Sequence, residues 1–383
     1  MKRMGCLMVV LVMLLGLLPV KVQAVDLDIP AKSALLMDAA TGTVIYERNS
    51  HEALAPASVT KVMTMLLIME AIADGRIGWD DGVTASETAA AKGGSQIYLK
   101  AGETMSVTDM VKSIAVSSAN DCACAMAEHI AGSETAFVDM MNKRAKKLGM
   151  NDTHFVNCTG LDDDPEAAQH KTSAYDIALM SRQLIANHPE IKKFTTIWMD
   201  TVRNGAFGLS NTNKLVRFYN GATGLKTGFT RAAGYCLSAT AQRDGMELIA
   251  VVMGCATSQE RFSACKAMLD YGFANYAVVA PELPEAAAVP VKLGVSDFVC
   301  AVPSGLSPLL VEKGQKSLIS TQITLDEYVD APVSKGQRLG SMTVYAGDQV
   351  LQQIPLVAES AVEKLTWGQV FMKLLKRLAM IGE

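Results

Sequence analysis

Ser58 and Lys61 are the first residues whose types and spacing suit covalent catalysis. They lie in the segment Pro56-Ala57-Ser58-Val59-Thr60-Lys61, where the proline favours the start of a helix. Residues three apart on a helix share one face, so we expect the lysine amine to reach the serine hydroxyl. A neutral amine activates serine by taking its proton, provided that burial or a nearby cation lowers the pKa of the lysine. Taken alone, the pattern also fits an exposed helix start.

A second motif, Ser118-Ala119-Asn120, falls between two helix-length stretches. A turn at this place directs a hydroxyl and an amide into a cleft, where the hydroxyl relays a proton and the amide holds a substrate. The alternative is an ordinary interhelical turn, in which Asn120 or Asp121 caps the following helix.

A third motif, Lys226-Thr227-Gly228, is followed by Phe229 and sits on a predicted edge strand. A cation and a hydroxyl at a strand edge bind a carboxylate, and a glycine lets a substrate backbone approach closely. The alternative is a strand end with a solvated lysine. The order of the three motifs, in one chain, is more specific than any of them alone.

Two hairpins and a group of helices must position these motifs. Apolar runs at 33–38 and 43–48 flank one turn, and runs at 235–242 and 246–254 flank an Asp-Gly turn. Helices with apolar faces are predicted at 58–73, 107–117, 121–130, 134–148, 174–186 and 258–276. Strands at both ends with helices between them predict an α+β fold, in which an antiparallel sheet carries a helical insert.

The ordered set resembles that of class A β-lactamases and penicillin-binding proteins, with Ala119 in place of the lactamase Asp. Further stretches resemble the D-alanyl-D-alanine carboxypeptidases among the low-molecular-mass penicillin-binding proteins, especially their sporulation-associated Gram-positive branch. The resemblance covers about residues 26–383 and is specific over about the first 280. Its stretches include Thr153-His154-Phe155-Val156, Gly160-Leu161-Asp162, Ser173-Ala174-Tyr175-Asp176, Gly221 to Gly228 and Ala233-Gly234-Tyr235.

The resemblance implies a role for each motif residue. Ser58 forms an acyl-enzyme with the penultimate D-alanine of a peptidoglycan stem peptide, and β-lactam antibiotics acylate the same serine. Lys61 is the general base, and Ser118 passes the proton to the leaving amine. The substrate is held by Asn120, Lys226, Thr227, Gly228 and Phe229, and the backbone N–H groups of Ser58 and Phe229 form an oxyanion hole. Arg217 and Arg261 are further candidates near the carboxylate, and no cofactor is implied.

Three alternative functions remain open. A β-lactamase of class A carries a Glu-x-x-Leu-Asn stretch, but Glu166 here precedes Ala-Ala-Gln-His, which favours slow release of penicillin. A D,D-endopeptidase uses the same residues and differs in how its cleft admits a second peptide. A non-catalytic β-lactam-sensing or wall-binding module keeps the third motif but has no need of both Ser58 and Lys61.

The two ends of the chain indicate export and contact with a membrane. Residues 1–24 combine Lys2 and Arg3 with an apolar run and small residues before Ala24, which predicts a signal peptide; an uncleaved anchor is the alternative. We expect the catalytic domain at 25–283 and a small all-β domain at 284–358, after a proline-rich linker. Residues 359–383 carry an apolar stripe bordered by cations, which predicts a helix on the outer surface of the cytoplasmic membrane, or else one packed on the protein's own core.

Composition excludes other classes of function. Removal of the three positive charges of the signal peptide takes the net charge from −4 to about −7, which argues against a nucleic-acid partner. Seven cysteines follow the signal peptide at irregular spacings, and the five histidines are scattered, so we expect no metal site. Most of these cysteines lie in apolar stretches, as buried thiols do.

Overall fold

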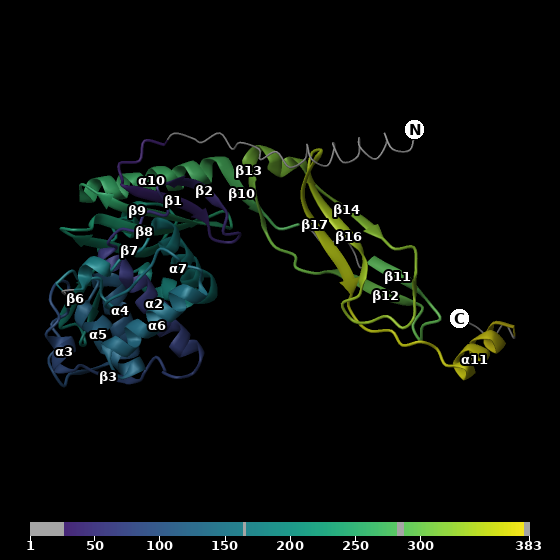
Figure 1. The fold of residues 1–383 in the computed structure, drawn as a ribbon, viewed down its shortest axis with the longest axis horizontal. Coiled ribbons are helices and arrows are strands. Elements are labelled where there is room, and N and C mark those ends of the chain that lie inside the picture. The colour runs from purple at the N-terminus through teal and green to yellow at the C-terminus, as the bar shows by residue number, and fades with distance from the viewer. Residues whose placement is uncertain (1–26, 164–165, 282–286, 379–383) are drawn as a thin grey trace.

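A five-stranded antiparallel sheet forms the centre of the larger part of the molecule (Figure 1), in the order β2-β1-β9-β8-β7. The computed structural model describes residues 27–163, 166–281 and 287–378, so the predicted signal peptide lies outside it. Both predicted hairpins are confirmed, because β1 pairs with β2 and β8 pairs with β9. Strand β1 also pairs with β9, which brings the two ends of this unit together. The strands are β1 (Ser33–Asp38), β2 (Val44–Arg48), β7 (Ala222–Thr230), β8 (Gly234–Arg243) and β9 (Met246–Cys255).

The two faces of this sheet are covered by different helices. Leu35 belongs to a core shared with the helical insert, whereas its neighbours Ala34 and Leu36 belong to a core shared with α10 (Ser258–Asn275). This alternation follows from the period of two in a strand. Thr257 and Glu260 start α10 with a capping box. The helix ends at Asn275, one residue before the predicted end, because Tyr276 begins a strand.

Five longer helices make up the insert, close to the ranges predicted from the sequence. They are α2 (Lys61–Ala73), α4 (Val107–Ser117), α5 (Asn120–Ala131), α6 (Glu134–Lys147) and α7 (Ala174–Asn187). Helix α2 is buried along most of its length, as expected of a helix that is apolar on every side. Shorter elements connect them: η1 (Ala57–Thr60), β3 (Gly82–Thr84), α3 (Glu87–Ala90), β4 (Thr104–Ser106), η2 (Ala167–Gln169), η3 (Pro189–Ile191), α8 (Lys192–Thr195), β5 (Met199–Val202), β6 (Phe207–Ser210) and α9 (Leu215–Phe218).

A second, β-rich unit follows α10. Its six-stranded sheet has the order β14-β16-β17-β12-β11-β15, and β16 and β17 form a hairpin. Strand β13, which lies within 284–358, pairs with β10, which precedes residue 284, so the division of the chain at 283/284 remains a proposal. The strands are β10 (Tyr276–Val279), β11 (Ala287–Lys292), β12 (Phe298–Pro303), β13 (Leu309–Glu312), β14 (Ile319–Leu325), β15 (Val329–Asp330), β16 (Arg338–Ala346) and β17 (Gln349–Ala358), with η4 (Lys313–Leu318).

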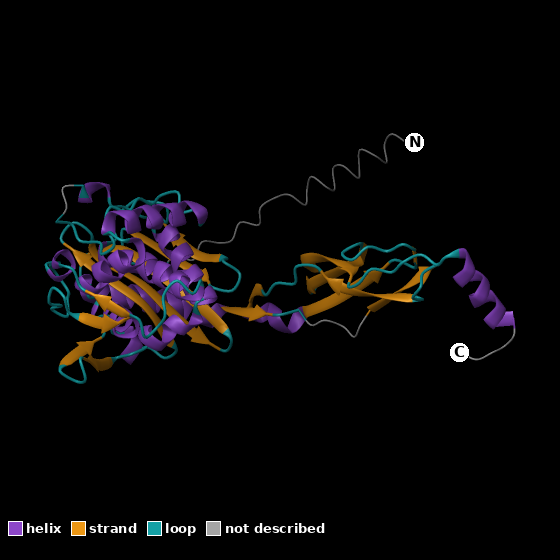
Figure 2. Cartoon of the chain, turned by 90° about the horizontal axis from the view of Figure 1, so that it is seen from below, coloured by secondary structure: helices purple, strands orange, loops and turns teal. Residues whose placement is uncertain are grey.

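Helix α11 (Trp367–Leu378) lies beyond the β-rich unit, at the end of the molecule away from the five-stranded sheet (Figure 2). Its apolar side chains are uncovered: Trp367 is 90% exposed and Phe371 63% exposed. The helix begins later than the predicted range of 359–383, and residues 379–383 lie outside the description. Within the described ranges, no helix is long and apolar enough to cross a bilayer.

Candidate active site

Ser58 sits in the short turn η1, which leads directly into α2. Ala57, just before it, has a φ of 49°, an unusual value for a residue with a side chain. Glycines hold this turn on both sides. A Cβ at Gly160 would lie 1.9 Å from the Ala57 carbonyl oxygen, and one at Gly228 would lie 2.6 Å from the Pro56 carbonyl oxygen. A side chain at Gly228 would therefore collide with the serine turn, and the role of Gly228 in admitting a substrate backbone stays a prediction.

Lys61 is fully buried and directed at the serine. Its Nζ donates hydrogen bonds to Ser58 Oγ at 2.9 Å and to the Thr159 carbonyl oxygen at 2.8 Å. Burial lowers the pKa of Lys61 to about 7, against opposing effects of Cys158 and Asp121. A large fraction of the amine is therefore neutral near pH 7, which is the form that is able to accept a proton.

Ser118 and Asn120 flank the junction of α4 and α5, as predicted. Ser118 ends α4 in the left-handed region with a φ of 62°, and Asn120 begins α5. Asn120 Nδ2 donates to the Gly93 carbonyl oxygen at 2.7 Å, and its buried Oδ1 has no hydrogen-bond partner among the described residues. The described residues include no hydrogen bond that joins Ser118 or Asn120 to Ser58.

The alternative that Asn120 or Asp121 caps α5 is wrong, because the N-cap is Ala119 and no side chain caps the helix. The buried Asp121 carboxylate instead accepts hydrogen bonds from the backbone N–H groups of Ile97 and Leu99. Asp121 therefore fixes the loop whose Gly93 carbonyl holds Asn120.

Lys226 and Thr227 lie on the edge strand β7. Lys226 is buried rather than solvated, and its Nζ donates to the Thr227 carbonyl oxygen at 3.0 Å. Burial, followed by the positive charges of Lys61 and Arg261, lowers the pKa of Lys226 well below its usual value. Because these three basic groups disfavour one another's charge, an anion bound among them would favour their protonated forms.

Phe229 follows at the end of the same strand, with 51% of its surface exposed. Its ring stacks on Tyr235 of β8, with the ring centres 4.3 Å apart. It is therefore held in place while one face remains open.

Two connections to the site were not predicted from the sequence. Thr212 joins the end of α4, just before the second motif, to the third motif: its N–H donates to the Val116 carbonyl oxygen at 3.2 Å, and Thr227 Oγ1 donates to its hydroxyl at 2.7 Å. The Thr159 carbonyl anchors Lys61. A backbone carbonyl leaves no signal in the sequence. The only signal for Thr212 was a weak one, its short distance along the sequence from the third motif.

The two arginines named as further candidates differ in their surroundings. Arg217 is exposed. Arg261 is buried, and its Nη1 donates to the Gly228 carbonyl oxygen at 3.0 Å, so it braces the strand that carries the third motif.

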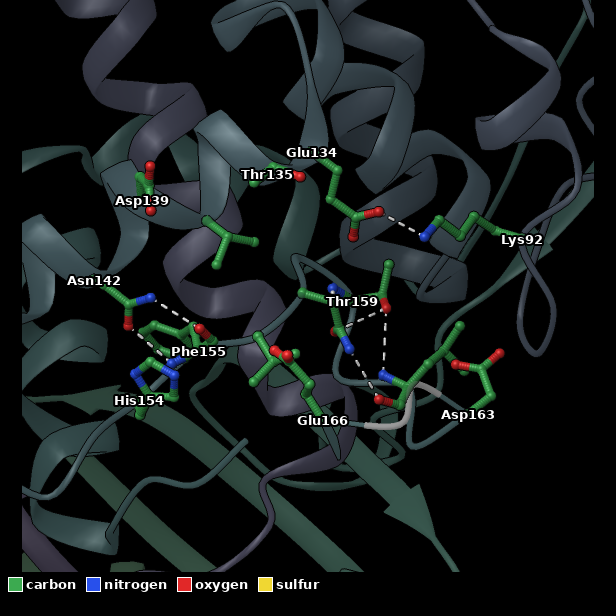
Figure 3. Close-up of a pocket in the computed structure, with 14 residues that line it drawn as sticks. Lys92, Glu134, Thr135, Asp139, Asn142, His154, Phe155, Thr159, Asp163 and Glu166 are labelled. Carbon is green, nitrogen blue, oxygen red and sulfur yellow. Dashed lines mark hydrogen bonds and ion pairs between the residues drawn. The ribbon is translucent and has the colours of Figure 1, made fainter. Parts of the chain in front are cut away.

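A pocket of about 570 Å³ lies behind the loop that anchors Lys61 (Figure 3). Its wall includes Thr159, Asn157 and the ion pair between Lys92 and Glu134, but none of the motif residues. The Asn157 side chain accepts hydrogen bonds from the N–H groups of Thr159 and Gly160, and so shapes the loop from this side. Among the described residues there is no cluster that could hold a metal ion.

Comparisons with known proteins agree with this geometry. The model of the D-alanyl-D-alanine carboxypeptidase family matches residues 20–257, and that of the penicillin-binding protein 5 C-terminal domain matches residues 284–364. D-alanyl-D-alanine carboxypeptidase DacF of Bacillus subtilis is 43% identical over 353 residues, covering 91% of this chain and 88% of its own. It represents the sporulation-associated branch that the sequence resembled.

Two solved structures share the architecture. Penicillin-binding protein 5 of Haemophilus influenzae has a TM-score of 0.76 at 30% identity, over 89% of this chain and 100% of its own. Penicillin-binding protein D2 of Listeria monocytogenes, in an ampicillin-bound form, has a TM-score of 0.59 at 33% identity, over 65% of this chain and 100% of its own. The expected penicillin-binding fold is thus confirmed, and the chain belongs to the D-alanyl-D-alanine carboxypeptidase family.

Proposed function

We propose that this protein removes the terminal D-alanine from peptidoglycan stem peptides through an acyl-enzyme on Ser58. The observation that carries the proposal is the hydrogen bond of 2.9 Å between Ser58 Oγ and the buried amine of Lys61. Family membership supplies the reaction class, a serine peptidase. The roles given below to single residues are part of the proposal.

Acylation begins when neutral Lys61 takes the proton of Ser58 as Oγ attacks the carbonyl carbon of the penultimate D-alanine. A C–O bond forms, and the backbone N–H groups of Ser58 and Phe229 stabilise the oxyanion. Collapse breaks the C–N bond, and the leaving nitrogen receives a proton through the Ser118 hydroxyl. Water then attacks the ester, with Lys61 again as the base, and releases the shortened peptide.

The substrate carboxylate is placed by the third motif. Lys226 and Thr227 face it from β7, where the nearby basic groups of Lys61 and Arg261 favour a bound anion. Binding of the carboxylate reverses the lowering of the Lys226 pKa, since an opposite charge favours the ammonium. The unpartnered Asn120 Oδ1 accepts a hydrogen bond from a substrate amide.

Penicillin acylates Ser58 by the same attack and leaves slowly. The relative from Listeria with bound ampicillin supports this part of the proposal. A β-lactamase is disfavoured by the sequence after Glu166, and a sensing module by the pairing of Ser58 with Lys61. An endopeptidase is less well supported, because the relative with that name, from Pseudomonas aeruginosa, matches only 55% of this chain.

We also propose that the protein works outside the cytoplasm, with α11 lying on the outer surface of the cytoplasmic membrane. The uncovered apolar side chains of Trp367 and Phe371 support this placement, since contact with lipid removes them from water. The β-rich unit then holds the catalytic unit away from the lipid. An ion pair between Lys373 and Asp297 of the loop before β12 joins α11 to that unit.

Release of D-alanine from a peptide ending in D-alanyl-D-alanine tests the function. Wild-type protein should release one D-alanine per peptide, and Ser58→Ala should release none while still folding. A wild-type protein that cleaves only cross-linked dimers would instead be an endopeptidase, and one that is acylated but cleaves neither substrate would be a sensor.

A further inference from the structure

Cys124 and Cys158 lie together beneath the loop that anchors Lys61. Cys124 belongs to α5 and Cys158 directly precedes Thr159, and both are fully buried. Both thiols point to one carboxylate: Cys158 Sγ lies 3.2 Å from Glu134 Oε1, and Cys124 Sγ lies 3.7 Å from Glu134 Oε2. Cys124 is also close enough to Cys158 to raise the pKa of the Cys158 thiol. They are therefore neighbours on two different segments of the chain.

Glu134 holds this arrangement in place. It accepts a hydrogen bond from the Cys158 N–H at 3.2 Å, and Lys92 neutralises its charge at 2.6 Å (Figure 3). The Glu134 carboxylate, neutralised by Lys92, therefore keeps the two sulfur atoms in position while both remain protonated thiols.

We propose that Cys124 and Cys158 form a disulfide when the chain folds outside the cytoplasm, a step that rests on the proposed export. Two thiols lose two electrons and two protons, and an external disulfide, such as oxidised glutathione or a disulfide oxidoreductase, is reduced to two thiols. One S–S bond forms between α5 and the loop, and one S–S bond of the oxidant breaks.

Two of the remaining cysteines donate hydrogen bonds to backbone carbonyl oxygens. Cys236 Sγ donates to the carbonyl oxygens of Ala55 and Ala233, and Cys265 Sγ donates to that of Ala250. Cys122 lies on the same helix as Cys124, but two residues along a helix it faces another side. We therefore expect one disulfide pair and five thiols among the seven cysteines that follow the predicted signal peptide.

Burial decides when the bond forms. The neighbouring thiol, burial and Glu134 together raise the pKa of Cys158 well above its ordinary value, so the folded thiol stays protonated. Because the thiolate is the nucleophile in disulfide exchange, oxidation of the folded protein is slow. The bond is made while the chain is still folding, and it is protected afterwards.

The cross-link ties the base to a second part of the site. The Cys158 carbonyl accepts a hydrogen bond from Thr64 Oγ1 of α2 at 2.6 Å, and the next carbonyl holds Lys61. Helix α5 begins with Asn120. Closing a loop of about 34 residues restricts the unfolded chain, and we expect the melting temperature to rise by roughly 5–15 °C.

Refolding with oxidised and reduced glutathione, followed by alkylation under denaturing conditions and peptide mapping, tests the proposal. We expect one cross-linked peptide pair containing Cys124 and Cys158, 2 Da lighter than the reduced pair, with the other cysteines alkylated. The oxidised protein should keep its penicillin labelling after heating to a temperature at which the reduced protein loses it. Folded, reduced protein should form the bond at least tenfold more slowly than refolding protein.

Cys124→Ser and Cys158→Ser should each abolish the cross-link and the thermal shift, whereas Cys300→Ser, in the β-rich unit, should change neither. Penicillin labelling of each variant shows that it has folded. Full alkylation of every cysteine after oxidative refolding, or a bond between any other pair, overturns the proposal. Because the bond is read by mass, its absence leaves the proposed peptidase function untouched.

Discussion

The rate of penicillin acylation should depend on pH through Lys61. Burial lowers the pKa of this lysine to about 7, and only the neutral amine takes the proton of Ser58. About one tenth of the amine is neutral one pH unit below that pKa, and about one hundredth two units below. We therefore expect the second-order acylation rate to fall about tenfold per pH unit below 7 and to level off above it.

Stopped-flow measurements with a fluorescent penicillin between pH 5 and 8.5 give this profile. The penicillin carboxylate is ionised throughout this range, so the profile reports the enzyme, and circular dichroism at each pH shows that the fold persists. A rate that changes less than about twofold between pH 5 and 7 refutes the assignment of neutral Lys61 as the base.

Other consequences concern stability and the membrane. Lys61→Met should abolish acylation yet stabilise the protein to urea by roughly 2 kcal/mol at pH 6, because the buried ammonium is costly below its folded pKa. This gain should shrink as the pH rises above about 7 and vanish only above about pH 11.5, where the lysine is neutral in both the folded and the unfolded state. Equal stability at pH 6 would contradict the burial cost. Gly160→Ala should lower the free energy of unfolding by about 3 kcal/mol or more and remove most acylation. Gly102 has the same left-handed φ but open space around it, so Gly102→Ala should lower the free energy of unfolding by only about 1 kcal/mol in the same urea titration. Similar losses of stability for both variants would contradict the clash of a side chain at position 160 with the Ala57 carbonyl. Deletion of residues 359–383 should release penicillin-labelled protein from sedimented membranes; retention would disprove anchoring by α11.

Local signals predicted most of the catalytic unit. The Asp244-Gly245 turn has a positive φ at both residues, which is why Asp-Gly identified the β8–β9 hairpin correctly. The helices were found because their apolar positions recur with the helical period, and their serine caps limit where they begin. Motif order then indicated that the first and third motifs lie close together, as Pro56 and Gly228 do, even though they are far apart in the sequence.

The contacts that tune the site could not be predicted, because they are non-local or involve the backbone. The Thr159 carbonyl reaches Lys61 across about 98 residues and carries no side-chain signature. Gly160 and Gly228 matter for the space around the serine turn, which only the packed fold defines. Likewise, the pairing of β10 with β13 joins strands of different predicted domains.

Mass spectrometry of the purified protein after incubation with penicillin tests the central claim most directly. We expect a single adduct, mapped by peptide digestion to Ser58, together with D-alanine release by untreated protein and none by the acylated form. An adduct on another residue, or no adduct on folded protein, would contradict it.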